Sequence, residues 1–160
     1  ITLILMENGT TAMTGHQDHP ATGQNFNAVT DKVPVRSVLE GLGVEQIYEA
    51  DTYQQKKLQE IVEKAVQDEG FSVVIARHPC MLKFTREQRR KKGYRPRRVS
   101  IDQAVCDRNH ACVAGFGCPT FTRNEDGSVK INTDLCIGDG SCIQTCPTTA
   151  IRPAKSGRYL

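Results

Sequence analysis

The last third of the chain is rich in cysteine, a residue whose thiolate binds soft metals. Of the seven cysteines, Cys80 alone lies outside this region. The other six are Cys106, Cys112, Cys118, Cys136, Cys142 and Cys146. No secretory signal peptide or long apolar run is visible, so we expect a cytoplasmic protein that does not span a membrane. Thiols stay reduced in that compartment, and clustered cysteines there are more often metal ligands than disulfides.

The spacing of these cysteines resembles the ligand pattern of bacterial dicluster ferredoxins, C-x2-C-x2-C-x3-C-P, which those proteins carry twice. Both groups here end in Cys-Pro, but Asn109 and Asp139 occupy the place of the second cysteine, and the first group has two extra residues before its final Cys-Pro. In such ferredoxins the fourth cysteine of each run binds the other cluster. That pairing implies one cluster bound by Cys106, Cys112 and Cys146 and another bound by Cys136, Cys142 and Cys118.

Each of these clusters has three thiolates, so it needs a further ligand or one iron fewer. Asp139 could supply an oxygen to the second cluster. In the first cluster Asn109 is a poor ligand, and His110 is a conceivable nitrogen donor. We therefore expect two iron–sulfur clusters of the 4Fe–4S or 3Fe–4S type. Zinc is the weaker alternative because it usually takes paired C-x2-C hooks, and a metal-free fold would gain nothing from six retained cysteines.

The two cysteine groups lie in related halves of one domain. Val99-Ser-Ile-Asp and Val129-Lys-Ile-Asn each lead into a cysteine group, which indicates an internal duplication. We predict a dicluster ferredoxin-like α+β domain over residues 99–160. Gly138 and Gly140 suit a tight turn whose backbone N–H groups point at cluster sulfides.

A polar loop follows an apolar run near the start of the chain. The run Leu3 to Met6 is typical of a strand in a covered parallel sheet, and Glu-Asn-Gly-Thr-Thr follows it. Ligands bind at the carboxyl ends of such strands. We interpret the stretch from Gly9 to Asn27, which contains His16 and His19, as a long functional loop.

The elements after this loop alternate between helix and strand. Pro34 precedes a predicted helix over residues 35–42, a strand follows over residues 46–49, and apolar residues at helical spacing from Leu58 to Val66 predict an amphipathic helix. Residues 71–76 form another apolar run. This order predicts the C-terminal part of a doubly wound α/β domain over residues 1–82, with further strands before Ile1.

Positive charge is concentrated between the two predicted domains. The formal net charge of the chain is only +3, and most of the excess lies between Lys83 and Arg98. Such a segment cannot form a core and predicts an exposed basic linker over residues 83–98. Nucleic-acid binding is not expected because the segment has Tyr94 but no known reading motif.

The loop sequence also carries a family resemblance. Glu7-Asn-Gly-Thr-Thr-Ala-Met-Thr-Gly-His-Gln17 resembles the thiamine-binding loop of the 2-oxoacid:ferredoxin oxidoreductases, most closely that of the large subunit of the indolepyruvate type. The resemblance continues through His19-Pro-Ala-Thr-Gly23, through Ser72 to Cys80, and into the ferredoxin-like domain. It implies that residues 1–82 are the C-terminal part of a thiamine-diphosphate-binding domain.

The same resemblance implies a thiamine diphosphate and Mg²⁺ site in this loop. By position, the Asn8 side-chain amide and the Thr10 carbonyl are the Mg²⁺ ligands, and oxygen ligands beside a diphosphate suit this cation. Thr11, Thr14 and His16 are further candidate cofactor-binding residues. The family's Gly-Asp-Gly or Gly-Asp-Ser turn, which supplies an aspartate to Mg²⁺, is absent and is expected upstream. No residue is assigned a catalytic step.

The reaction that this resemblance implies is the oxidative decarboxylation of a 2-oxoacid, here an arylpyruvate such as indolepyruvate, to an acyl-CoA. Electrons would pass through the clusters to ferredoxin or another acceptor. The expected partners are the remainder of the thiamine-binding subunit, a smaller gamma-type subunit and coenzyme A. The missing second cysteines depart from the family pattern. The alternative is a non-catalytic dicluster electron-transfer module that docks to a separate enzyme. The basic linker is expected to be a solvated connector, and a docking strip for an acidic ferredoxin or coenzyme A phosphates is its alternative role.

Overall fold

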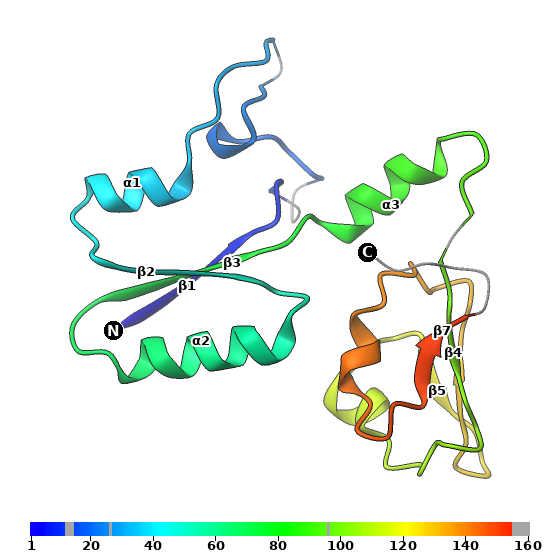
Figure 1. Cartoon of the computed structure of the whole chain (residues 1–160). Coiled ribbons are helices and arrows are strands. Elements are labelled where there is room, and N and C mark those ends of the chain that lie inside the picture. Colours follow the sequence, from blue (N-terminus) through cyan, green and yellow to red (C-terminus); the bar gives the residue numbers. More distant parts are fainter. Residues whose placement is uncertain (12–14, 26, 96, 155–160) are drawn as a thin grey trace. The chain divides into compact units, whose positions relative to one another are not determined.

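The computed structural model describes residues 1–11, 15–25, 27–95 and 97–154 (Figure 1). The chain folds into two compact units, Ile1–Phe84 and Thr85–Leu160. The boundary lies inside helix α3 (Met81–Arg89), so the first residues of the predicted basic linker are helical. Among the described residues, no helix combines the length and the apolar character needed to cross a membrane.

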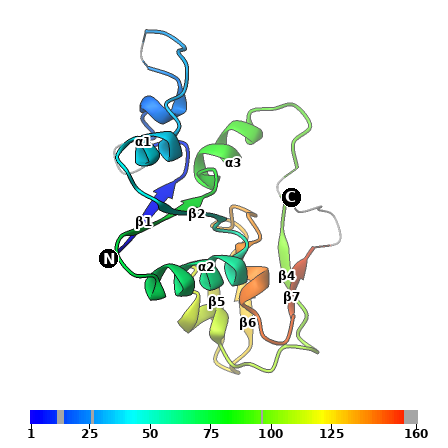
Figure 2. The same cartoon turned by 60° about the vertical axis from the view of Figure 1, so that its left-hand side comes forward.

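The first unit is built on a three-stranded parallel sheet with the order β1-β3-β2. Its strands are β1 (Thr2–Glu7), β2 (Gln46–Asp51) and β3 (Ser72–Arg77). Besides the start of α3, its helices are η2 (Pro20–Thr22), α1 (Val35–Gly41) and α2 (Gln55–Gln67). Figures 1 and 2 show α1 and α2 on opposite sides of the sheet. The predicted α/β class is confirmed.

The central strand β3 forms the core of this unit because helices cover both of its faces. The run from Val73 to Ile75 is fully buried. Leu39 of α1 packs with Val73 and Ile75 on one face. On the α2 side, the Ser72 hydroxyl donates a hydrogen bond of 2.8 Å to the carbonyl oxygen of Ala65. A strand covered on both faces has a continuous apolar sequence rather than an alternating one.

Strand β1 is the exposed edge of the described sheet, whereas the sequence predicted a covered strand over Leu3 to Met6 with further strands before Ile1. Leu3, Ile4 and Met6 are 44%, 50% and 82% exposed. The reason is that β1 lies at the edge of the sheet, where it pairs with β3 alone among the described strands. Apolar sequence indicates what a strand can bury, but its neighbours decide what it does bury.

The limits of α1 follow from local sequence signals. Pro34 is the N-cap residue and adopts an extended conformation, as expected for a residue whose ring fixes φ. At the other end Gly43 has a φ of +81°. Its N–H donates to the carbonyl of Glu40, and the N–H of Val44 donates to the carbonyl of Leu39. This left-handed glycine ends the helix.

In its described residues, the second unit holds two antiparallel strand pairs and two short helical turns. Strand β4 (Val99–Ile101) pairs with β7 (Ile151–Pro153), and β5 (Phe121–Arg123) pairs with β6 (Val129–Ile131). The helical turns are η3 (Ala111–Gly115) and η4 (Ser141–Thr145). The buried residues of its core are Val99, Phe121, Val129, Cys142 and Ile151.

The predicted duplication is visible in the hydrogen bonds of this unit. The Asp102 N–H, just after β4, donates to the Ala150 carbonyl at 2.9 Å. The Asn132 N–H, just after β6, donates to the Thr120 carbonyl at 2.7 Å. The carbonyls of Asp102 and Asn132 then accept the N–H groups of the first cysteine of each group. Each half therefore leads a strand into a cysteine turn in the same way.

Candidate cofactor sites

Three cysteines from different halves of the second unit line one small cavity. Cys106 and Cys112 come from the first half, and Cys146 comes from the second. Burial raises the pKa of Cys112, and the charges of Cys106 and Cys146 raise it further. The apolar side chains of Ile101, Val129 and Ile151 also line this cavity. The fold thus brings together the three thiols that the crossover pairing implied for the first cluster.

The other three cysteines form a second group around Cys142. This thiol is buried, and burial is the main reason that its pKa rises to about 12. The negative charges of Asp139, Cys136 and Cys118 raise it further, in that order. Cys118 belongs to the first half of the unit, so this group also contains one cysteine that crosses over.

Both groups suit a cofactor that supplies positive charge. Burial and the neighbouring negative charges disfavour the thiolate forms of Cys112 and Cys142 and raise both pKa values, and a bound cation would offset these effects. Iron does this, because a coordinating thiol is deprotonated by the metal. Within the described ranges, no three Cys, His, Asp or Glu side chains form a group that could hold a single metal ion.

Cys146 differs from these two thiols because hydrogen-bond donors surround it. Burial raises its pKa, but the Thr148 hydroxyl and the N–H groups of Ile151, Ala150 and Thr148 lower it, and the net effect is a lowered pKa. The Ala150 N–H lies 3.3 Å from the Cys146 sulfur. Donors of this kind favour the thiolate, which is the form that binds metal.

The residues that replace the second cysteines differ in what their side chains do. The Asn109 amide oxygen accepts the Ala111 N–H at 2.8 Å, and its nitrogen donates to Asp107 at 2.7 Å, so this amide shapes the turn. The His110 Nε2 donates to the carbonyl of Gly127 at 2.8 Å. The Asp139 carboxylate accepts the Ser141 hydroxyl at 3.0 Å and is close enough to Cys142 to raise its pKa. The charge of Asp139 therefore acts directly on the second group.

The two cysteine turns share a left-handed backbone, but glycine occupies it only in the second. Arg108 and His110 have φ values of 58° and 61°, and Gly138 and Gly140 have 74° and 77°. A non-glycine residue in this region costs on the order of 1 kcal/mol. The first turn is thus held in a strained conformation by its surroundings.

Thr145 provides an independent test of whether a cluster fits. Its hydroxyl, in η4 next to Cys146, is buried and has no hydrogen-bond partner among the residues that the structure describes. Buried hydroxyls normally have a partner, and leaving one unpaired costs about 1–3 kcal/mol. An iron–sulfur cluster offers sulfide acceptors. The unpaired hydroxyl beside a cysteine group fits such a cofactor.

The predicted thiamine loop starts where expected, at the carboxyl end of β1. The Asn8 side-chain oxygen accepts the Thr10 N–H at 3.0 Å. Thr10 is 5% exposed, and its hydroxyl donates to the Gln17 carbonyl at 3.1 Å. Backbone hydrogen bonds join Thr11 to Gln17 in both directions. The loop is therefore folded back on itself, with amide and carbonyl oxygens at the strand end, a donor set that fits Mg²⁺.

Contacts with the end of β3 hold the base of this loop. The N–H of His78 donates to the Glu7 carbonyl at 3.1 Å, and the N–H of Cys80 donates to the Asn8 carbonyl at 2.8 Å. The His16 Nε2 lies 3.6 Å from the Cys80 sulfur. Thr14, another candidate cofactor-binding residue, lies outside the described residues.

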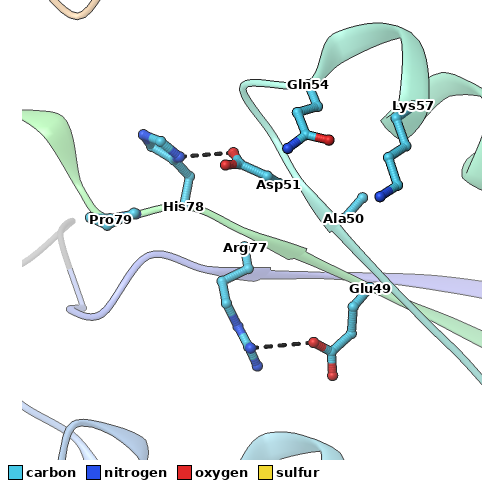
Figure 3. A pocket seen from close by; sticks show the side chains of 8 residues that line it. All are labelled: Glu49, Ala50, Asp51, Gln54, Lys57, Arg77, His78 and Pro79. Carbon is cyan, nitrogen blue, oxygen red and sulfur yellow. Dashed lines mark hydrogen bonds and ion pairs between the residues drawn. The ribbon is translucent and has the colours of Figure 1, made fainter. Parts of the chain in front are cut away.

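The structure also shows a pocket of about 290 Å³ at the carboxyl ends of β2 and β3, which the sequence did not predict (Figure 3). His78 donates from Nδ1 to Asp51 at 2.8 Å, and its ring stacks on Tyr53 with 3.6 Å between centroids. Arg77 pairs with Glu49 at 3.2 Å. Gln54, the N-cap residue of α2, and Lys57, in its first turn, also line the pocket. One feature of the sequence could have indicated this pocket: polar residues directly follow both strands. Ligands of parallel sheets bind at these carboxyl ends of the strands.

Comparison with known families and proteins agrees with both halves of this description. A family described as "Thiamine pyrophosphate enzyme, C-terminal TPP binding domain" matches residues 1–76, and a "4Fe-4S binding domain" matches residues 129–152. The second match contains Cys136, Cys142 and Cys146. The first unit is thus similar to thiamine-binding domains and the second unit to 4Fe–4S proteins.

The chain is also similar to individual proteins along nearly its whole length. The indolepyruvate oxidoreductase subunit IorA of Archaeoglobus fulgidus is 35% identical over 155 residues, which cover 96% of this chain and 24% of that protein. The corresponding subunit of Thermococcus kodakarensis is 31% identical over 158 residues, covering 98% of this chain and 24% of that protein. A ferredoxin of Pyrobaculum islandicum is 37% identical over 58 residues, covering 36% of this chain and 54% of that protein. The chain spans about a quarter of the length of the two oxidoreductase subunits.

Proposed function

Because the chain belongs to the family of the indolepyruvate oxidoreductase subunit IorA, we propose that it supplies part of the thiamine site and the electron exit of a 2-oxoacid:ferredoxin oxidoreductase. The substrate would be an arylpyruvate such as indolepyruvate, which loses CO₂ and is transferred as an acyl group to coenzyme A. The electrons released would leave through two iron–sulfur clusters to ferredoxin. Thiamine diphosphate supplies the carbon chemistry when bound.

The chain's own residues have two tasks in this proposal. In the first unit, Asn8 and Thr10 hold Mg²⁺ through side-chain and backbone oxygens, and the neighbouring loop residues Thr11, Thr14 and His16 contact the thiamine cofactor. In the second unit, Cys106, Cys112 and Cys146 hold one cluster, and Cys118, Cys136 and Cys142 hold the other. Asp139 is the candidate fourth ligand of the second cluster, and His110 is the candidate for the first.

The observation that carries the proposal is the crossover of the cysteines. Cys146 lies with Cys106 and Cys112, and Cys118 lies with Cys136 and Cys142. If the cysteines served only as small core residues, there would be no reason for each group to contain one cysteine from the other half of the unit. The pairing of dicluster ferredoxins, in which each fourth cysteine binds the other cluster, accounts for this arrangement.

The complete enzyme would work in the cytoplasm together with the rest of its thiamine-binding subunit and a smaller gamma-type subunit. A non-catalytic electron-transfer module is the second candidate function, favoured by the similarity of one third of the chain to a ferredoxin. The match of residues 1–76 to thiamine-binding domains favours the enzyme.

The test is made on the complete enzyme, purified without oxygen. Iron and acid-labile sulfide are measured, and EPR spectra are recorded before and after dithionite reduction. We expect two clusters in the second unit, thiamine-dependent release of CO₂ from indolepyruvate, and reduction of ferredoxin. Iron without decarboxylation would leave the electron-transfer module as the function, and a protein that binds no iron would contradict both candidates.

A further inference from the structure

The segment Arg86–Arg98 carries a concentration of positive charge that the proposed thiamine and cluster sites do not use. Between Lys83 and Arg98 lie nine of the chain's 21 Lys and Arg residues, and Glu87 is the one acidic residue there. The other basic residues of the chain number 12 against 17 acidic ones. The chain is therefore net negative elsewhere, and the positive charge of this segment is local.

This charge is directed to solvent. The exposed side chains of the segment are Arg86, Arg89, Arg90, Lys91, Lys92 and Arg95. In the part of the chain that the structure describes, none of these six forms an ion pair. Two of them, Arg86 and Arg89, lie in the last turn of α3. Six unpaired cations along a short stretch repel one another and provide a strong local field for an anionic partner.

The end of the basic segment is fixed against the second cysteine turn. A Cβ atom at Gly138 would lie 2.2 Å from the carbonyl oxygen of Arg97, so the two backbones are in direct contact. The Arg98 guanidinium donates to the Thr133 carbonyl at 2.8 Å, and the Arg98 carbonyl accepts the N–H of Ala154 at 2.9 Å. Arg97 therefore lies beside the turn that connects Cys136 to Cys142.

The short distance along the chain from Arg95 to Arg97 keeps the last exposed charge of the segment close to the second cysteine turn. Arg95 is two residues from Arg97, a stretch that spans at most about 7 Å. Interactions between exposed charges are largely screened by salt beyond about 8 Å at physiological ionic strength. An acidic surface bound at the Arg95 end of the segment would consequently lie next to the second cysteine group.

We propose that the segment Arg86–Arg98 is the docking surface for an electron-carrier protein with an acidic surface, and that electrons leave through the cluster held by Cys118, Cys136 and Cys142. This inference rests on the proposed function. In the step, the reduced cluster loses one electron and the oxidised carrier gains one; no covalent bond or proton changes place. Charge complementarity would increase the rate of encounter and orient the carrier toward the cluster.

The test uses the complete enzyme and a purified acidic dicluster ferredoxin. Arg89→Glu/Arg90→Glu should raise the KM for ferredoxin by about tenfold or more and leave reduction of methyl viologen, a small cationic dye, unchanged. The matched control is Arg123→Glu/Lys130→Glu, which reverses two exposed charges on the β5–β6 pair of the same unit and should change the KM much less. Calorimetry of oxidised ferredoxin binding, at low and high salt, measures docking without turnover and should show the same loss.

Several results would overturn the docking proposal. An unchanged ferredoxin Kd would do so, as would an equal effect of the control variant, which would indicate a response to net charge alone. A raised KM for coenzyme A with ferredoxin binding intact would assign the segment to phosphate recognition. Loss of methyl viologen reduction would assign it to electron transfer inside the enzyme. Failure of the unmodified enzyme to oxidise indolepyruvate while still binding ferredoxin would count against the proposed function and leave docking in place.

Discussion

At the scale of single residues, Thr145 gives the most direct test of cluster binding. Its buried hydroxyl has no hydrogen-bond partner within the described ranges, and hydrogen bonds to cluster sulfur stabilise the more negative, reduced state. We expect Thr145→Val to lower the reduction potential of one cluster by about 40 mV, which corresponds to one hydrogen bond of about 1 kcal/mol. The potential is measured by an EPR-monitored redox titration.

The matched control for this change is Thr122→Val, because Thr122 is exposed on β5. It should leave both potentials unchanged. Equal potentials in Thr145→Val and the unmodified enzyme would contradict hydrogen bonding between this hydroxyl and a cluster. The iron content should stay the same in every variant because neither threonine is a proposed ligand.

At the scale of elements, the packing of the second cysteine turn can be tested through Gly138. This residue and Gly127 have φ values of 74° and 80°, so alanine at either position has the same backbone strain of about 1 kcal/mol. Only at Gly138 would the new Cβ collide with backbone, at 2.2 Å from the Arg97 carbonyl oxygen, because the nearest atom at Gly127 is 3.9 Å away.

We therefore expect Gly138→Ala to lose its cluster on heating several times faster than Gly127→Ala. The measurement is the decay of the visible cluster absorbance of the complete enzyme at fixed temperature. Equal decay rates would show that the contact between Arg97 and Gly138 does not support the cluster, and would also remove a step in the argument for the docking surface.

The elements also show what the sequence could predict. Strands and helices of the first unit were predictable because apolar periodicity and stop signals such as Gly43 are local. The exposure of β1 was not, because it depends on which strands stand beside it. Helix α3 was also missed. Lys, Arg, Glu and Gln have good helix propensity, but the high charge of the segment was interpreted as an exposed, solvated stretch. The family resemblance could be recognised from the sequence because its residues are contiguous along the loop. The comparisons with known proteins and families confirm it.

The candidate sites also include features that the sequence could predict and features that it could not. The crossover grouping of the cysteines was implied by the resemblance to dicluster ferredoxins, in which the fourth cysteine of each run binds the other cluster. The pair formed by His78 and Asp51 was missed because these residues are 27 positions apart and meet only where β2 and β3 end side by side. A contact of this kind becomes visible only when strand order and register are known.

At the scale of the whole molecule, the two compact units should have separable roles. The proposed Mg²⁺ and thiamine ligands lie in Ile1–Phe84, and every proposed cluster ligand lies in Thr85–Leu160. We expect Cys112→Ser and Cys142→Ser, made singly in the complete enzyme, each to abolish ferredoxin reduction. Serine lacks the soft thiolate that a cluster requires, and each change removes a ligand from a cluster that has only three cysteines.

The affinity for thiamine diphosphate, measured by calorimetry, should stay within about twofold of the unmodified enzyme, because distant and independent sites do not couple. Ala114→Ser is the control, since it introduces serine at an exposed position of the same helical turn, η3, without removing a thiolate. It should keep full iron content and ferredoxin reduction. If either cysteine variant loses thiamine binding together with its iron, the cluster unit also supports the structure of the thiamine site, and the separation of roles argued from the two units is wrong.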